Sequence, residues 1–266
     1  HPREVHKLFC SKLYQMKRLF FDIETSPCIG WFWRPGYRVR LNYDNILEQA
    51  QIICISYKWE GEDKAYTLTW EDKSDQKPVT EFVRIMAQAD EIVGHNGDRF
   101  DIPWVRTRAL YHGIDNVPRW KTLDTLKKSR ANFKLPTNKL NDIGRYFGLG
   151  EKIHNPPGLW QNVCFGDGSR LQELVEYCEQ DVYLLEKVYN KIKGATPYGT
   201  HVGVVNGGPK WSCPSCGSLQ VVRNGTHVTK TGQQQQKMQC KDCKRSYRVT
   251  TLQYSKYLEY QLKNRK

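Results

Sequence analysis

The sequence lacks a hydrophobic run long enough to cross a membrane, and its start shows no signal-peptide pattern. A bilayer-spanning helix needs about 20 consecutive apolar residues. A disulfide framework is also missing, because only four of the nine cysteines lie in paired motifs and the other five are scattered. Such cysteine usage is typical of a reducing compartment. We therefore expect a cytoplasmic protein, in a bacterium or in a phage-infected host cell.

Acidic residues are scarce in the C-terminal quarter of the chain. Residues 195–266 hold 12 Lys and Arg against 2 Asp and Glu, which is a net charge of +10. The whole chain has a net charge of +13, so residues 1–194 carry only +3. A positive charge concentrated in this way favours a polyanionic partner. We expect a basic appendage that binds nucleic acid, joined to a nearly neutral core.

Hydrophobic periodicity predicts an α/β domain. Short apolar or alternating runs predict strands, and apolar residues spaced three or four apart predict helices. The expected strands are 18–24, 51–61, 64–70 and 90–96, and the expected helices are 78–89, 100–113, 139–148 and 169–194. Three strands come first, and helices and strands then alternate. This order indicates a mixed sheet with helices on its faces.

The segment from Gly194 to Pro209 contains five glycines and two prolines, which is typical of a linker. It divides the chain into an α/β domain and a smaller basic module. The expected boundaries are an N-terminal extension at 1–16, the α/β domain at 17–194, the linker at 195–209, a cysteine module at 210–250 and a basic tail at 251–266. The tail could form a short helix or remain frayed.

Two carboxylates end the first predicted strand, in the sequence FFDIET. Asp22 and Glu24 are two residues apart, so in a strand their side chains project from the same face. Two like charges in a buried setting repel each other unless a cation lies between them. This stretch therefore indicates a metal site.

Two further acidic motifs have a similar setting. Asp101 ends HNGDRFD, just after a predicted strand, and Asp181 ends YCEQD within the longest predicted helix. Tyr177 precedes Asp181 by four residues, which places both side chains on one face of that helix. Carboxylate oxygens suit Mg²⁺ or Mn²⁺. Two such ions about 4 Å apart can clamp a phosphodiester during hydrolysis.

The motifs FDIET, HNGDRFD and YCEQD, in this order and at this spacing, resemble the three motifs of the DEDD superfamily of 3′–5′ exonucleases. That superfamily has a ribonuclease H-like fold and includes the DnaQ-type proofreading subunit. The resemblance covers residues 17–194. It implies that two Mg²⁺ or Mn²⁺ ions are held by Asp22, Glu24, Asp101 and Asp181. The position of Tyr177 resembles the tyrosine branch of the superfamily, in which this hydroxyl orients the attacking water.

The same resemblance implies that Thr25 meets the terminal nucleotide through its backbone. The segment GWFWRPGYRVR at 30–40 follows directly and is rich in aromatic and basic residues. It admits two interpretations. Trp33 and Arg34, with Arg38 and Arg40, could line the path of a single strand, or Trp31 and Trp33 could pack onto the core.

Four polar residues in or after the second motif admit other roles. Asn96 is a candidate substrate contact, although it and His95 also suit an ordinary turn. Asp98 is expected to be a solvated loop charge rather than a ligand. Asp124 could support the metal ligands or cap a helix, and the cap is favoured.

Two C-x-x-C pairs, CPSC and CKDC, are separated by 23 residues. A tight turn at each pair would bring two thiolates to one ion, and four cysteines suit tetrahedral Zn²⁺. We expect a zinc-ribbon-like β module with one structural zinc bound by Cys213, Cys216, Cys240 and Cys243. His227 is not needed as a ligand. The module's basic residues, with Trp211 and Tyr247 among them, suit phosphate contact and base stacking.

These features together predict a metal-dependent 3′–5′ exonuclease that hydrolyses phosphodiester bonds from the 3′ end of nucleic acid, with DNA favoured over RNA. Replication or recombination proteins are the expected protein partners. Two rivals stay open: a non-catalytic nucleic-acid-binding or recruitment protein, and a transposase- or resolvase-like endonuclease. The acidic pair on the first strand and Tyr177 favour the exonuclease.

Overall fold

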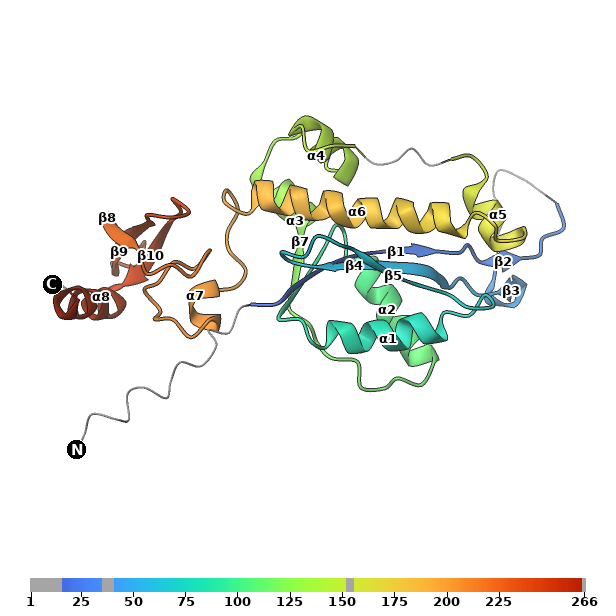
Figure 1. Cartoon of the computed structure of the whole chain (residues 1–266), viewed down its shortest axis with the longest axis horizontal. Helices are drawn as coiled ribbons and strands as arrows, with labels where there is room; N and C mark the ends of the chain where they lie inside the picture. Colours follow the sequence, from blue (N-terminus) through green and yellow to red (C-terminus); the bar gives the residue numbers. More distant parts are fainter. Residues whose placement is uncertain (1–15, 35–40, 152–155, 265–266) are drawn as a thin grey trace. The chain divides into compact units, whose positions relative to one another are not determined.

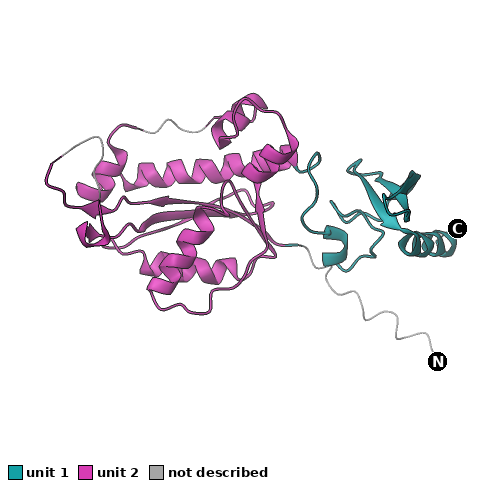
Figure 2. Cartoon of the chain, turned by 180° about the vertical axis from the view of Figure 1, so that it is seen from behind, with its two compact units in different colours: residues 1–16, 193–266 teal, residues 17–192 magenta. Residues whose placement is uncertain are grey.

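The computed structural model describes residues 16–34, 41–151 and 156–264. The chain forms two compact units, residues 17–192 and residues 193–266 with the N-terminal residues up to Met16 (Figure 2). The expected N-terminal extension thus lies almost wholly outside the described residues. No helix in the described ranges is long and apolar enough to cross a membrane.

The larger unit is built around a mixed sheet. Its elements are β1 (Arg18–Thr25), β2 (Ile29–Gly30), the 3₁₀ helix η1 (Tyr43–Asn45), β3 (Ile46–Glu48), β4 (Ile52–Trp59), β5 (Tyr66–Thr69), α1 (Gln76–Met86), β6 (Glu91–Gly94), α2 (Asp101–Tyr111), β7 (Thr122–Asp124), α3 (Thr125–Asn132), α4 (Leu140–Tyr146), α5 (Leu159–Phe165) and α6 (Leu171–Ile192). Within the described ranges, five strands form one sheet in the order β5-β4-β1-β6-β7. β5, β4 and β1 pair antiparallel, whereas β1, β6 and β7 pair parallel. The predicted α/β class with a mixed sheet is confirmed.

Helices cover both faces of this sheet, with α6 on one side and α1 and α2 on the other (Figure 1). Alternate side chains of a strand point to opposite faces. Phe20 of β1 accordingly packs with Val182 of α6. Its neighbour Phe21 packs with Phe82 of α1 and Val105 of α2. Every second residue of β1 therefore lies under α6, and this determines where Asp22 and Glu24 point.

A buried ionic cluster joins β4 to helices α1 and α2. Asp75, at the N-cap position of α1, accepts hydrogen bonds from Nε and Nη2 of Arg108 at 2.6 and 2.7 Å. It also accepts the backbone amide of Ile52 at 2.9 Å, and Nε2 of His112 lies 2.6 Å from the carboxylate. Burial opposes ionisation, but the hydrogen bonds from Arg108, Ile52 and His112 hold the pKa of Asp75 below its ordinary value.

The smaller unit packs a sheet against a C-terminal helix. Its elements are α7 (Val202–Val205), β8 (Val221–Val228), β9 (Gln234–Cys240), β10 (Ser246–Thr250) and α8 (Thr251–Lys263). Over residues 193–264 the strands form a sheet in the order β10-β9-β8. Tyr257 of α8 packs with Met238 and Val249 and donates its hydroxyl to the carbonyl of Val221 at 3.0 Å. Of the two alternatives for the tail, the structure has the helix, which begins with a capping box at Thr250.

The segment expected to be a linker contains α7 and packs on the cysteine module. Arg245 donates to the carbonyls of Lys193 and Thr196. Gly203 approaches the backbone around Ser212 so closely that an added Cβ would lie 2.0 Å from Oγ of Ser212. The glycines here therefore permit close packing as well as turns.

Candidate active site

The acidic residues of β1 lie between two apolar clusters under α6. One cluster joins Val182 of α6 to Phe20 of β1. The other joins Leu174 and Cys178 of α6 to Cys54 of β4. Along α6, Asp181 follows Cys178 by three residues and directly precedes Val182. The apolar packing of α6 is thus interrupted at the position where the carboxylates of β1 face it.

The structure brings Asp22 and Glu24 against this turn of α6. The ligand atoms of Asp22, Glu24 and Cys178 all lie within 4.8 Å of one another. Sγ of Cys178 lies 3.5 Å from the carbonyl oxygen of Asp22 and 3.9 Å from its Oδ2. Asp181, one turn beyond Cys178 on the same side of the helix, is only 2% exposed. Three of the four predicted carboxylates therefore come from two facing elements.

Asp101 reaches the same end of β1 from the other side. It is the first residue of α2 and is 3% exposed, and its Oδ1 accepts the backbone amide of Ile23 at 3.2 Å. Ile23 lies between Asp22 and Glu24 in the strand. The pairing of β6 with β1 ends at Val93 and Phe20. Beyond this point the carboxylate of Asp101, and not the backbone of β6, accepts the hydrogen bond from β1. The fourth predicted ligand is thereby attached to the backbone between the first two.

Cys178 is the neighbour that the sequence reasoning missed. Burial raises the pKa of its thiol well above the ordinary value, and Cys54, Asp22 and Glu24 add to the shift. The thiol is therefore neutral near pH 7 and is not a thiolate nucleophile. The missed signal was its spacing, because Cys178 precedes Asp181 by three residues and shares its helix face.

Tyr177 is half-buried near the start of the same turn. Its ring meets the ring of Trp160 in α5 edge to face, with centroids 5.9 Å apart. The spacing of four residues places it on the same side of α6 as Asp181. α5, which the sequence pattern did not predict, thus supports the tyrosine.

The donor set of this site fits hard divalent cations. Its carboxylates supply only oxygen atoms, and Asp101 and Asp181 are almost completely buried. A buried group of acidic side chains is costly unless positive charge neutralises it. We call Asp22, Glu24, Asp101 and Asp181 the acidic site. The group whose ligand atoms lie within 4.8 Å of one another consists of Asp22, Glu24 and Cys178, so binding of Mg²⁺ or Mn²⁺ by all four carboxylates stays a prediction.

The turn after β6 is held by a hydrogen-bond network. His95 lies 2.9 Å from Oγ1 of Thr125 through Nδ1 and 2.9 Å from the carbonyl of Asn138 through Nε2. Asn96 has a φ of 71°, and its amide donates to Oδ1 of Asp124 at 3.1 Å. Both residues therefore have the turn role that the sequence allowed, and a substrate contact by Asn96 stays a prediction.

Two neighbouring aspartates behave as the sequence indicated. Oδ1 of Asp124 accepts the amides of Leu126 and Lys127, so Asp124 caps α3, as expected. Asp98 forms an ion pair with Lys127 at 2.7 Å. The possible metal-binding group around Asp22 consists of Asp22, Glu24 and Cys178, so Asp98 and Asp124 lie outside it, as do Asp101 and Asp181.

Exposed aromatic rings follow the acidic strand. Trp33 is 92% exposed, and its ring meets Trp31 edge to face at 5.7 Å. Packing onto the core is therefore wrong for Trp33. Arg34 is also exposed, whereas Arg38 and Arg40 lie outside the described residues. Thr25 is half-buried as the last residue of β1, where the register with β4 shifts.

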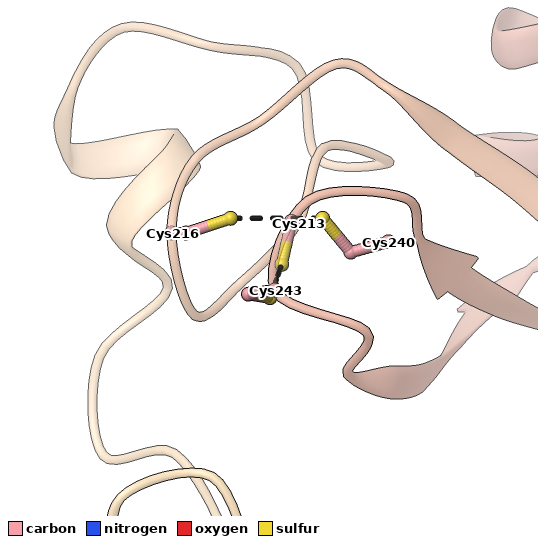
Figure 3. Close-up of side chains that lie close together, drawn as sticks. All are labelled: Cys213, Cys216, Cys240 and Cys243. Carbon is pink, nitrogen blue, oxygen red and sulfur yellow. Dashed lines mark hydrogen bonds between the residues drawn. The ribbon is translucent and has the colours of Figure 1, made fainter. Parts of the chain in front are cut away.

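In the smaller unit, the four predicted cysteines come together (Figure 3). Sγ of Cys213 lies 3.5 Å from Sγ of Cys243, and Sγ of Cys216 lies 3.6 Å from Sγ of Cys240. A disulfide would need about 2.05 Å, whereas a zinc tetrahedron with bonds of about 2.3 Å has sulfur atoms about 3.8 Å apart. The cysteine cluster is therefore compatible with Zn²⁺.

Some of the expected nucleic-acid contacts of the smaller unit are wrong. Trp211 and Tyr247 are 3% and 6% exposed, and the Tyr247 hydroxyl donates to the Trp211 carbonyl at 2.6 Å. They build the core of the unit and have no face free for base stacking. Nε of Arg223 donates a hydrogen bond to Oε1 of Gln236 at 2.8 Å. Arg245 donates a hydrogen bond to the carbonyl of Lys193, in the segment before α7.

Comparison with known proteins gives one family match. A family model described as the RNase_H superfamily matches residues 47–193, more than half of the chain. The matched range includes Asp101, Tyr177 and Asp181 and begins after Asp22 and Glu24. This match confirms the predicted ribonuclease H-like fold.

Two relatives are DNA polymerases. The DNA polymerase delta catalytic subunit of Glycine max is 21% identical over 233 residues, which cover 68% of this chain and 20% of that protein. The chain thus spans about a fifth of the length of this relative. The family B DNA polymerase of the archaeon Pyrobaculum calidifontis is 19% identical, with a TM-score of 0.49 over 67% of this chain and 25% of that chain.

Proposed function

Because the chain belongs to the RNase_H superfamily, we propose that it is a metal-dependent 3′–5′ exonuclease acting on DNA. Membership of this superfamily supports a nuclease-like function. The assignment as a metal-dependent nuclease rests on the acidic site. The 3′–5′ direction of cleavage rests on the resemblance of FDIET, HNGDRFD and YCEQD to the DEDD motifs, in which the position of Tyr177 resembles the tyrosine branch. Similarity to a DNA polymerase subunit favours DNA over RNA.

The observation that carries the proposal is the position of Asp101. Its carboxylate binds the backbone amide of Ile23, between Asp22 and Glu24, although 78 residues separate them in the chain. On the other side of β1, Cys178 places the turn of α6 that bears Asp181 against the same two carboxylates. Acidic groups from three elements around one strand end, with Asp101 and Asp181 almost completely buried, support a divalent-metal site.

Each residue has a distinct role in the proposed reaction. When bound at the acidic site, two divalent ions would supply an activated water molecule and neutralise the leaving oxygen. Tyr177 would orient the water by a hydrogen bond from its hydroxyl. Thr25 would contact the terminal nucleotide through its backbone, and Asn96 would lie beside it. Trp33 would stack on an unpaired base, with Arg34 on a phosphate.

We further propose that catalysis belongs to residues 17–194 and nucleic-acid binding to the zinc-ribbon-like module at 210–250. The segment 195–209 lies between them in the sequence, and residues 251–266, which include α8, form a basic C-terminal tail. A bound Zn²⁺ would stabilise a module whose core is too small to be stable alone. Joining the two units raises the effective concentration of substrate near the acidic site.

The test is a digestion assay with single- and double-stranded DNA labelled at the 3′ end or internally. We expect Mg²⁺- or Mn²⁺-dependent release of labelled mononucleotide from the 3′ end. The variants Asp22→Asn and Asp181→Asn, which keep side-chain volume, should lose at least about 100-fold in rate. Asp98→Asn is the matched control, because Asp98 precedes Asp101 by three residues but pairs with Lys127.

The same assay separates the rivals. Nicks inside closed circular DNA would indicate an endonuclease, and binding without any cleavage would indicate a recruitment protein. Cleavage by both Asn variants at the wild-type rate would reject the acidic site.

A further inference from the structure

The solvent-facing side of the small sheet has an unusual charge arrangement. Because Met238, Tyr247 and Val249 face the buried side, the alternate residues of each strand face outward. We call this surface the outer face; it consists of Val222, His227, Gln235, Lys237, Gln239, Ser246, Arg248 and Thr250. α8 packs against the opposite side through Tyr257 and therefore does not cover the outer face.

Two cations lie directly opposite each other on this face. Arg248 of β10 pairs in register with Lys237 of β9, and both side chains are exposed. Like charges at directly opposed positions destabilise a sheet. Slight desolvation and the positive charges of Arg248 and Lys237 also lower the pKa of His227. The fold gains nothing from this repulsion, which an anionic ligand would relieve.

The chain supplies no counter-charge within the sheet. None of the residues of β8, β9 and β10, all of which the structure describes, is acidic. The other residues of the outer face are mostly amides and hydroxyls, such as the half-buried Gln235 and Gln239 and the exposed Ser246. Such groups donate and accept hydrogen bonds, as groove edges of base pairs do.

The outer face also lacks what a single strand requires. Sequence-independent binding of single strands relies on aromatic rings on which bases stack. None of the outward-facing residues of these three fully described strands is Phe, Tyr or Trp, His227 is their single aromatic ring, and the rings of Trp211 and Tyr247 are buried. A two-stranded ribbon fits the DNA major groove, which is about 12 Å wide, whereas the major groove of duplex RNA is too narrow for side chains to read.

We propose that the outer face binds double-stranded DNA, with the β9–β10 ribbon in the major groove. Lys237 and Arg248, one on each strand of the ribbon, would lie near phosphates or guanine edges. The glutamines lie where they could meet adenine edges. This inference goes beyond the proposed nuclease, because it assigns duplex binding to the smaller unit and does not depend on cleavage.

The test is a binding titration of the full chain in buffer without Mg²⁺, Mn²⁺ or chelator, so that DNA stays intact and zinc is retained. The probes are a fluorescent 20-base-pair DNA duplex, its single strand and a duplex RNA of the same length. The double variant Lys237→Gln/Arg248→Gln should bind duplex DNA at least about tenfold more weakly at 0.15 M salt. In a plot of the logarithm of the association constant against the logarithm of the salt concentration, the slope for the double variant should be smaller in magnitude than the wild-type slope by about two.

The matched control is Lys256→Gln/Lys263→Gln, which removes the same charge from exposed positions of α8. This control should change duplex binding by less than about threefold. Zinc content and circular dichroism of each variant verify that the unit is folded. Replacing guanines by 7-deazaguanine, which removes a major-groove acceptor, should also weaken binding of the wild type.

An equal loss of affinity for duplex DNA in the two double variants would overturn the assignment of the outer face as the binding surface. An equal loss for single-stranded DNA or duplex RNA would overturn the groove assignment. Loss of cleavage in Asp22→Asn with duplex binding intact would leave this inference standing, so the two proposals fail separately.

Discussion

The carboxylate of Asp101 accepts a hydrogen bond from the amide of Ile23 at 3.2 Å, at the point where β6 no longer pairs with β1. One side chain thus binds the backbone of β1 beyond the end of its pairing with β6 and is also a predicted metal ligand. These two roles depend on different properties of the group. The hydrogen bond needs an acceptor oxygen, whereas metal binding needs the negative charge.

We therefore expect Asp101→Asn and Asp101→Ala to separate the two roles. The asparagine keeps the acceptor, so the free energy of unfolding should change by less than about 1 kcal/mol while cleavage falls at least about 100-fold. The alanine leaves the buried Ile23 amide unpaired and should also lower the free energy of unfolding by about 1–3 kcal/mol. Urea unfolding and the digestion assay measure the two effects, and equal stability of both variants would contradict this assignment.

Trp33→Ala should weaken substrate binding without affecting the fold. The ring is 92% exposed, so the free energy of unfolding should stay within about 0.5 kcal/mol of wild type. Loss of a stacked base should raise KM for single-stranded DNA roughly tenfold with little change in kcat. Trp33→Phe should restore much of the affinity. Tyr146→Ala, which removes another exposed ring, is the control, and an equal effect there would argue against stacking by Trp33.

Asp75 should be important for stability but not for the reaction. Removing its charge in Asp75→Asn leaves Arg108 buried without its partner, so we expect the free energy of unfolding to fall by about 3–5 kcal/mol. The folded state holds the pKa of Asp75 below its ordinary value. Its contribution is therefore present above the unfolded pKa of about 3.9 and is lost as the pH falls through the lower folded pKa. Unfolding measured between pH 2 and pH 7 should show this loss in wild type and not in Asp75→Asn.

Zinc removal should affect the smaller unit selectively. Metal analysis should find about one Zn²⁺ per chain, and Cys216→Ser should release it. Since Trp211 packs in one cluster with Cys213 and Cys240, near-ultraviolet circular dichroism should report the loss of its fixed environment. Ser255→Ala, at an exposed position of α8, is the control. A full complement of zinc in Cys216→Ser would show that the four-cysteine site is not the zinc ligand set.

The sequence alone determined the acidic and cysteine motifs, since both are short-range patterns. Asp22 and Glu24 share a face because a strand has a period of two. Tyr177 and Asp181 share one because a helix turns every 3.6 residues. The long strands and helices were predicted for the same reason. Short elements such as β7 and α5 were not, because three to seven residues carry too little periodicity.

Only the tertiary structure decided which of these residues meet. The bond from Ile23 to Asp101 and the position of Cys178 beside Asp22 join elements far apart in the chain. The burial of Trp211 and the opposition of Lys237 to Arg248 depend on packing and strand register. Local patterns report the conformation of a segment, but contacts between segments follow from how apolar faces and hydrogen-bonding groups are satisfied together across the whole fold.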